Sequence, residues 1–305
     1  MPLYIAKRLL TMIPVLFAII TISFFVMRKA PGGPFDADRV LPDEVKANIE
    51  KKYHLDESIG RQYLRYMNDV IHLDLGPSFK YADRSVNDII KAHAPISFRL
   101  GAMALALALL IGIPAGCIAA LRQNSALDYS AMAVALIGIS IPNFVIASVL
   151  MFVFSLKLGW LPVAGWDSWR NMVLPVITLS LYYTAFVARL SRAGLLEVIN
   201  QDYIRTARAK GLHERTVLVR HALRGGLMPV VTFLGPATAG ILTGSLVVEK
   251  IFGIPGIGSE FVYSALNRDY TLVLGTVILY STFLIVLNLV VDVLYTYLDP
   301  RIEFK

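Results

Sequence analysis

Six long stretches of the sequence contain no Asp, Glu, Lys or Arg, and their apolar residues do not alternate with polar ones. A helix crosses about 30 Å of hydrocarbon with about 20 residues, and each stretch has 18 to 28 residues. The lack of alternation excludes the strands of a membrane β-barrel. We therefore predict six transmembrane helices, over Leu9–Met27, Leu100–Leu121, Tyr129–Leu156, Asn171–Ala188, Gly225–Val248 and Tyr270–Val291.

The first, third and fourth predicted spans carry internal prolines at Pro14, Pro142 and Pro175. Proline removes a backbone donor and often kinks a membrane helix. Pro142 and Asn143 lie near the middle of the third span, where two interpretations stay open. The kink either faces a polar cavity in the membrane or is satisfied by a neighbouring helix.

The composition agrees with a membrane protein. Of the 305 residues, 56% are hydrophobic and 17% are charged, and the mean hydropathy is +0.62. A soluble domain has about 25% charged and about 45–50% apolar residues. One cysteine, Cys117, excludes a disulfide framework. The predicted fold class is an all-α polytopic membrane protein.

Basic residues are unevenly distributed among the short loops and set the predicted orientation. The segment Arg189–Arg224 has eight basic and three acidic residues, which is typical of a cytoplasmic loop. Both termini are then cytoplasmic, and residues 31–98 lie outside. The formal net charge of +7 follows from this asymmetry and needs no nucleic-acid partner.

The outer region has helical patterns of its own. Val45, Ile49 and Tyr53 recur every four residues, a second stripe includes Tyr63 and Met67, and residues 85–88 have capping-box spacing. We expect a small helical region, with a solvated loop as the alternative. The predicted divisions are an anchor helix at 1–30, this region at 31–98, a five-helix core at 99–299 with a cytoplasmic loop at 190–226, and a tail at 300–305.

The cytoplasmic loop predicts two short helices separated by a bend. Ile204, Ala207 and Gly211 lie near one helical face, where small residues would allow close approach of a partner. Gly211 is suited to end the first helix, and Arg215–Leu223 forms the second. Periodicity alone leaves two interpretations of this loop open. It is either a protrusion that fits a cleft on another protein or a basic amphipathic segment that lies on anionic lipid.

The residues of this loop resemble a known motif, the coupling loop of ABC importer permeases. Aligned on Gly211, the chain keeps Ala207 but lacks the Glu, first Ala, Ile and Pro of the general pattern. The residues that replace them resemble the version of the motif found in the peptide-transporting branch of the family. Further segments resemble the B-type permeases of bacterial oligopeptide importers. They are Gly76–Tyr81, Ser85–Asp88, Glu249–Gly258, Ala265–Tyr270 and Asp299–Arg301.

The resemblance implies a type I ABC importer permease fold in the bacterial inner membrane. The implied partners are a homologous second permease, two cytoplasmic ATPase subunits, an extracytoplasmic peptide-binding protein, the oligopeptide substrate and membrane lipid. ATP and Mg would be bound by the ATPases, so this chain would need no cofactor and would not be an enzyme. The implied ATPase-coupling helix consists of Arg205, Thr206, Ala207, Arg208, Ala209, Lys210, Gly211, Leu212 and His213.

Gly253, Pro255, Gly256 and Gly258 form a turn that we expect on the outer face, as a gate or receptor contact or as a purely structural turn. The turn lacks the Gly-Lys-Ser/Thr ending of a phosphate-binding loop.

Other functions remain as alternatives. Dipeptide and nickel permeases share the coupling loop and the Gly-Pro-Gly element. A self-contained secondary transporter usually needs ionisable groups deep in the membrane, and we find none in mid-span. The five histidines, His54, His72, His93, His213 and His221, have no metal-ligand spacing, so no metal site is expected.

Overall fold

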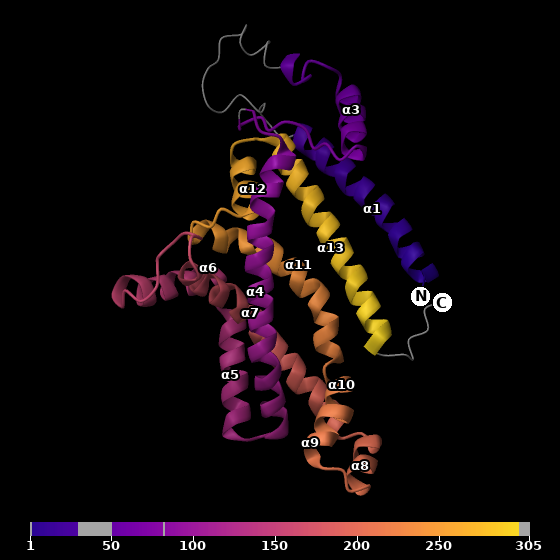
Figure 1. Ribbon diagram of the computed structural model, residues 1–305, viewed down its shortest axis with the longest axis vertical. Helices are drawn as coiled ribbons and strands as arrows, with labels where there is room; N and C mark the ends of the chain where they lie inside the picture. The colour runs from indigo at the N-terminus through magenta and orange to yellow at the C-terminus, as the bar shows by residue number, and fades with distance from the viewer. Residues whose placement is uncertain (1, 30–50, 82, 299–305) are drawn as a thin grey trace. The chain divides into compact units, whose positions relative to one another are not determined.

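The computed structural model describes residues 2–29, 51–81 and 83–298, and the chain is drawn in Figure 1. Within that part the predicted all-α class is confirmed, because the β contact there is one isolated bridge between Pro77 and Ser85. The helices are α1 (Pro2–Lys29), α3 (Ile59–Ile71), α4 (Val86–Leu121), α5 (Ala126–Ser140), α6 (Asn143–Leu150), the π-helical η1 (Met151–Lys157), α7 (Trp169–Ile199), α8 (Asp202–Ala209), α9 (Glu214–Thr216), the π-helical η2 (Val217–Ala222), α10 (Leu223–Gly226), α11 (Met228–Ile251), α12 (Ile257–Leu266) and α13 (Tyr270–Leu298).

Among the described residues, four helices are long and apolar enough to cross a membrane unaided. They lie in α1, α4, α7 and α13. Two further crossings result if each of two bent pairs counts as one span: α5 with α6 and η1, and the helical run 214–226 with α11. The six predicted apolar stretches therefore all fall on helical segments, and four to six of them are spans by length and composition.

The predicted span Tyr129–Leu156 is broken at its proline into two helices and not merely kinked. The chain bends by 103° between α5 and α6, far more than a kink. Pro142 has no N–H to continue the α5 ladder, and Ile141 before it is extended, with φ −88° and ψ 124°. Proline disfavours the helical conformation of the residue that precedes it. The helix therefore stops at Ser140 and a new one begins at Asn143.

Helix α4 begins where the sequence predicts a cap. The Ser85 hydroxyl accepts a hydrogen bond from the Asp88 backbone N–H at 3.1 Å and donates to the Asp88 carboxylate at 2.6 Å. The helix then continues unbroken to Leu121. The capped segment is thus the beginning of the second apolar helix, not a separate helix of the outer region.

The structure consists of two compact units. The first unit comprises Met1–Ser97 and Pro255–Phe283, and the second comprises Phe98–Ile254 and Leu284–Lys305. In the first unit, Phe24 of α1 packs on Tyr63 and Tyr66 of α3, with ring centroids 5.4 and 5.7 Å apart, and Leu274 of α13 joins the same core. The predicted helix around Tyr63 and Met67 is confirmed, whereas the Val45–Ile49 pattern lies outside the described residues.

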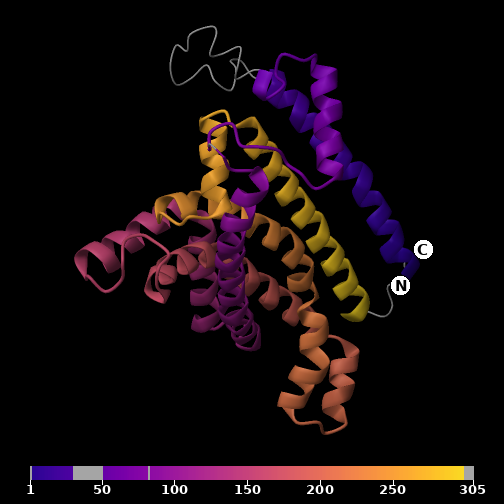
Figure 2. The ribbon, with the colours of Figure 1, turned by 45° about the horizontal axis from the view of Figure 1, so that its top comes forward.

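The second unit is built around α7, which packs against α5, α6, α10 and α11. Close approach of helices depends on glycine. A methyl group placed on Gly116 of α4 would lie 2.2 Å from the carbonyl oxygen of Ala188 in α7. Small residues at such contacts let helix backbones meet in a membrane, where packing replaces the hydrophobic effect. In Figures 1 and 2, α8 and α9 project past the ends of α7 and α11.

Candidate functional site

The projecting segment, residues 200–226, is a pair of short helical stretches joined by a bend, which we name the tip. Ile204 and Ala207 of α8 are buried against Val217 and Ala222 of η2. The same core cluster contains Leu195 and Val198 of α7. Because it buries these side chains within the chain, the expectation that this face meets a partner is corrected for Ile204 and Ala207. The helical pair itself is present as predicted.

The surface that the tip leaves free is strongly basic. Arg205 and Arg208 of α8, Lys210 after it, and Arg215 and Arg220 of the second stretch are exposed. Ile204 is inaccessible and the Arg205 side chain retains 71% of its accessible surface. The predicted site residues on this free surface are Arg205, Thr206, Arg208, Ala209, Lys210, Gly211, Leu212 and His213.

Gly211 ends α8, as the sequence predicts. It has φ +75°, the left-handed region that favours glycine. Its N–H donates to the Arg208 carbonyl at 2.9 Å, which satisfies one of the last carbonyls of the helix. No other part of the structure lies within 4 Å of a methyl group placed on Gly211, so the bend has open space around it.

An ion pair closes the tip. Arg208 donates to both carboxylate oxygens of Glu214, from Nε at 3.1 Å and from Nη2 at 2.6 Å. These hydrogen bonds raise the pKa of Arg208 and hold the pKa of Glu214 below its usual range. His213 adds a cap, since its Nδ1 accepts from the Arg215 backbone N–H at 3.2 Å. Both side chains of the ion pair are exposed, so the pair contributes little to stability.

The base of the tip rests on α7 through two glycines. A methyl group placed on Gly194 of α7 would lie 2.2 Å from the carbonyl oxygen of Gly226 in α10. No side chain larger than hydrogen fits between these backbones. The base of the tip is therefore in direct backbone contact with α7.

Sequence reasoning missed an ion pair near this base, between a buried aspartate and a partly exposed arginine. Asp128 in the first turn of α5 accepts from Arg192 Nε at 2.5 Å and from Arg192 Nη2 at 2.7 Å. The Asn124 backbone N–H donates to the same carboxylate at 3.0 Å. The one available signal was the cap spacing of Ser125 and Asp128, because the Ser125 hydroxyl accepts from the Asp128 N–H at 3.3 Å.

The turn Gly253–Gly258 follows α11. In the second unit, Gly253 has φ +59°, and the carbonyl of Phe252 just before it accepts from the Gly165 N–H at 2.9 Å. In the first unit, Gly256 precedes α12 and Ile257 donates its N–H to Ser97 Oγ at 2.9 Å. Gly253 and Pro255 are exposed, whereas Gly256 and Gly258 are buried. Only the first part of the turn is therefore free to contact another molecule.

A polar cluster in the first unit fixes the second half of this turn. His93 Nδ1 donates to the Pro255 carbonyl at 2.9 Å, and the His93 ring faces Glu260 at 4.0 Å. Tyr81 donates to Glu260 at 2.9 Å. Partial burial and the Glu260 carboxylate raise the pKa of Tyr81 to about 12.

A second buried carboxylate was missed as well. Asp269, just before α13, accepts hydrogen bonds from the Ser78 hydroxyl, from the Phe79 N–H at 3.1 Å and from the Leu272 N–H at 3.2 Å. It caps α13 and holds segment 76–81, which is nearly 190 residues earlier in the chain.

Pro142 and Asn143 stand at the break between α5 and α6. The Pro142 carbonyl accepts from the Val145 and Ile146 N–H groups at 3.0 and 3.2 Å, so this carbonyl is satisfied within α6. A cluster of three or more His, Cys, Asp or Glu side chains suited to a metal is absent from the described residues.

Comparison with known proteins identifies the family. Residues 112–304 match the family described as binding-protein-dependent transport system inner membrane component. The chain is 50% identical to the oligopeptide transport system permease protein OppB of Haemophilus influenzae and 52% identical to that of Salmonella typhimurium, with 99% of each chain covered. It is 46% identical to the dipeptide transport system permease protein DppB of Bacillus subtilis, over 98% of this chain and 97% of that protein.

Two solved structures share the fold. One is the inward-facing MetNI methionine ABC transporter, with a TM-score of 0.59 and 17% identity, which covers 69% of this chain and 96% of the other. The second is an amino acid ABC transporter, with a TM-score of 0.52 and 15% identity, covering 69% and 94%. The resemblance seen in the sequence is confirmed, and the chain belongs to the family of binding-protein-dependent transport system inner membrane components.

Proposed function

We propose that this chain is a permease subunit of an ATP-driven ABC importer that transports oligopeptides. The observation that carries the proposal is the basic tip of α8, Gly211 and α9, whose residues are those that resemble a coupling loop in sequence. The tip belongs to a chain 50–52% identical, over 99% of its length, to proteins named oligopeptide permeases.

The proposed topology has six crossings with both termini in the cytoplasm, in the type I importer arrangement. Each bent helix pair then counts as one span. This orientation puts the tip on the cytoplasmic side, and it is supported by the eight basic residues of segment Arg189–Arg224.

In the proposed mechanism, residues Arg205–His213 dock in a cleft of a cytoplasmic ATPase. Closure of two ATPases on ATP would draw this tip toward that of a homologous second permease. The buried core around Ile204 and Ala207 makes the tip rigid, and the Gly194–Gly226 contact joins it to α7. A conformational change requires contacts that differ between its two states, and the cleft supplies them.

The remaining partners act on the outer face. An extracytoplasmic peptide-binding protein docks there and releases its peptide into the path between the two permeases. The exposed residues Gly253 and Pro255 are candidates for this contact or for an outer gate. ATP and Mg are held by the ATPases, so the chain itself binds no cofactor and catalyses no reaction.

Dipeptide transport is the second candidate within the same family. The 46% identity to the Bacillus subtilis dipeptide permease extends over nearly the whole chain. The two candidate functions differ in the length of the transported peptide. A nickel permease of the same family is a further alternative.

Reconstitution in liposomes tests the proposal. The chain, its second permease, both ATPases and the binding protein are combined, and ATP-dependent uptake of a labelled pentapeptide, a dipeptide and Ni²⁺ is measured. Oligopeptide uptake that requires ATP and all subunits is expected. Preferential dipeptide or Ni²⁺ uptake would replace the proposed substrate, and uptake by this chain alone on an ion gradient would overturn the mechanism.

A further inference from the structure

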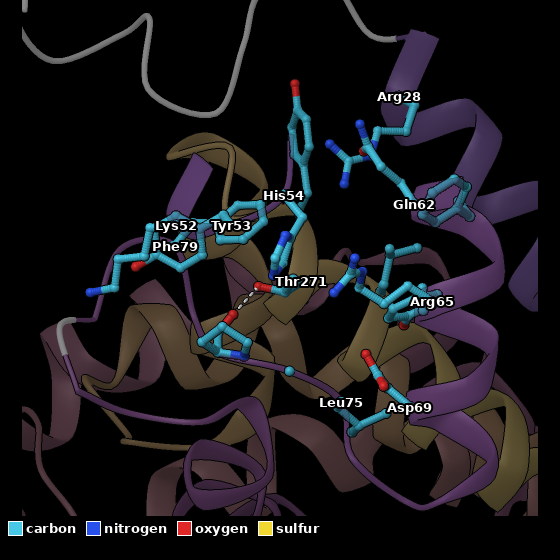
Figure 3. A pocket seen from close by; sticks show the side chains of 16 residues that line it. Arg28, Lys52, Tyr53, His54, Gln62, Arg65, Asp69, Leu75, Phe79 and Thr271 are labelled. Atoms are coloured by element: carbon cyan, nitrogen blue, oxygen red, sulfur yellow. Dashed lines mark hydrogen bonds between the residues drawn. The ribbon is translucent and has the colours of Figure 1, made fainter. Parts of the chain in front are cut away.

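The first unit contains a cavity of about 290 Å³ that the proposed transport cycle does not use. Its wall is formed by the end of α1, residues 52–54, α3, segment 75–79 and the first turns of α13. Figure 3 shows the guanidinium groups of Arg28 and Arg65 reaching toward the His54 ring, with Lys52 on the opposite rim.

Basic side chains predominate among the charged residues of this cavity. Arg28, Lys52 and Arg65 line it, against Asp69 as the acid among its described lining residues. Arg65 is neutralised by Glu57, because Arg65 Nη2 lies 2.5 Å from Glu57 Oε1. Two positive charges thus remain against one negative charge.

Arg28 and Lys52 contact aromatic rings instead of carboxylates. The Arg28 guanidinium lies 5.4 Å from the centroid of Phe24 and 5.9 Å from that of Tyr270. The Lys52 ammonium lies 5.6 Å from the ring of Tyr53. Within the described part of the chain, neither cation has a carboxylate within 4.0 Å.

An oxyanion with one negative charge fits this arrangement. A guanidinium presents planar donors that match a phosphate or carboxylate, and it is weakly hydrated for a cation. Arg28 is only partly exposed, so its interaction with an anion is less screened than one in open water. The ligand therefore carries a group such as a phosphodiester.

The surface next to the cavity selects an amphiphile over a soluble anion. On α1, within two turns before Arg28, Ile22 is 63% exposed, Phe25 37% and Val26 61%. An arginine that ends an apolar span of this kind lies at the level of the lipid headgroups. A peptide carboxylate or free phosphate ester would use the cations but not this apolar surface.

We propose that the cavity binds the phosphodiester headgroup of one anionic phospholipid, with Arg28 as the contact of its phosphate, Lys52 adding positive charge at the opposite rim, and its acyl chains along the exposed side of α1. The bound headgroup connects the end of α1 to residues 52–54 and strengthens the first unit. The site does not depend on which substrate is transported.

The test is native mass spectrometry of the purified permease complex, released from detergent with added lipid. Phosphatidylglycerol is compared with phosphatidylcholine, with glycerophosphoglycerol, which lacks acyl chains, and with a tripeptide. We expect one retained phosphatidylglycerol, whose affinity falls about tenfold in Arg28→Gln, as for loss of a hydrogen bond to a charged group. Lys29→Gln removes a charge from the next residue, which does not line the cavity, and should retain the lipid.

Several results would overturn the proposal. One is an equal loss of phosphatidylglycerol affinity in Arg28→Gln and Lys29→Gln, and another is retention of phosphatidylcholine equal to that of phosphatidylglycerol. Binding of glycerophosphoglycerol as tight as that of the lipid would mean that the ligand is a soluble anion. Displacement of the lipid by the tripeptide would also contradict the proposal. If Arg28→Gln does not assemble, Lys52→Gln and Arg28→Lys decide the question. The proposal requires weaker retention in Lys52→Gln than in Lys29→Gln. It also requires reduced but measurable retention in Arg28→Lys, because lysine keeps the charge and lacks the planar donors. Unchanged retention in Lys52→Gln refutes it.

Discussion

Asp128 and Arg192 form a two-point ion pair that joins the first turn of α5 to α7, seven residues before α7 ends at Ile199. Asp128 is 1% exposed. Both carboxylate oxygens accept from the guanidinium, and the Asn124 N–H donates to one of them. The pair therefore fixes the position of α7 just ahead of the tip that we propose as the ATPase contact.

Removing either member of this pair should destabilise the second unit. A hydrogen bond to a charged group contributes about 1.5–3 kcal/mol, and Asp128→Asn leaves the Arg192 charge without its partner. We expect a lower thermal unfolding temperature in detergent for Asp128→Asn and for Arg192→Gln. The loss of unfolding free energy in the double variant should be smaller than the sum of the two single losses by about 1 kcal/mol or more. Strict additivity would show that the two residues do not support each other.

Gly194→Ala should separate the tip from α7. The added methyl group would lie 2.2 Å from the Gly226 carbonyl oxygen, so one backbone must move, and overpacking of this kind costs about 1–3 kcal/mol. We expect normal membrane insertion but reduced peptide-stimulated ATPase activity in the reconstituted complex. Gly138→Ala is the matched control, because its methyl group would meet atoms only at 3.4 Å and beyond. Equal activities of the two variants would contradict the direct contact.

Asp269→Asn should loosen the first unit. Asp269 Oδ1 accepts from the Phe79 and Leu272 N–H groups, and Oδ2 accepts from the Ser78 hydroxyl. An amide nitrogen in place of either oxygen therefore faces a donor, and a buried donor without an acceptor costs about 1–3 kcal/mol. We expect segment 76–81 to become sensitive to limited proteolysis. Asp74→Asn, at an exposed position in the same region, serves as control. Equal resistance of both variants would show that Asp269 does not hold the segment.

The sequence predicted what depends on local pattern. Apolar runs located the long helices, and Gly211 was correctly identified as the end of α8, because a left-handed residue is needed there. At Pro142 the sequence indicated only a disturbed helix. The 103° angle depends on what α6 and η1 pack against, and a proline does not encode that.

Contacts between distant residues were not predictable from one sequence. Asp128 and Arg192 are 64 residues apart, and each looked like an ordinary charge near a span end. The face of Ile204 and Ala207 was recognised as a contact face, but its partners are η2 and α7 of the same chain. Periodicity shows that a face is buried and does not show what buries it.

The Arg208–Glu214 pair allows the internal geometry of the tip to be separated from docking on an ATPase. Arg208→Glu places two acids together and should abolish peptide uptake. The exchange Arg208→Glu with Glu214→Arg restores an internal pair but reverses both charges on the outer surface. If the tip contacts an acidic cleft, the exchange variant stays inactive despite normal insertion. Full recovery of uptake would mean that only the internal pair matters.

Glu214→Gln is the control for this pair, because it removes the ion pair and keeps the Arg208 charge. Since exposed pairs contribute little, we expect uptake close to that of the unchanged protein. The lowered pKa of Glu214 means that the pair is complete above the usual glutamate range and is lost only as the pH falls through the lowered value. Uptake should therefore show no dependence on this pair between pH 6 and 8. A Glu214-dependent step in that range would contradict the assignment.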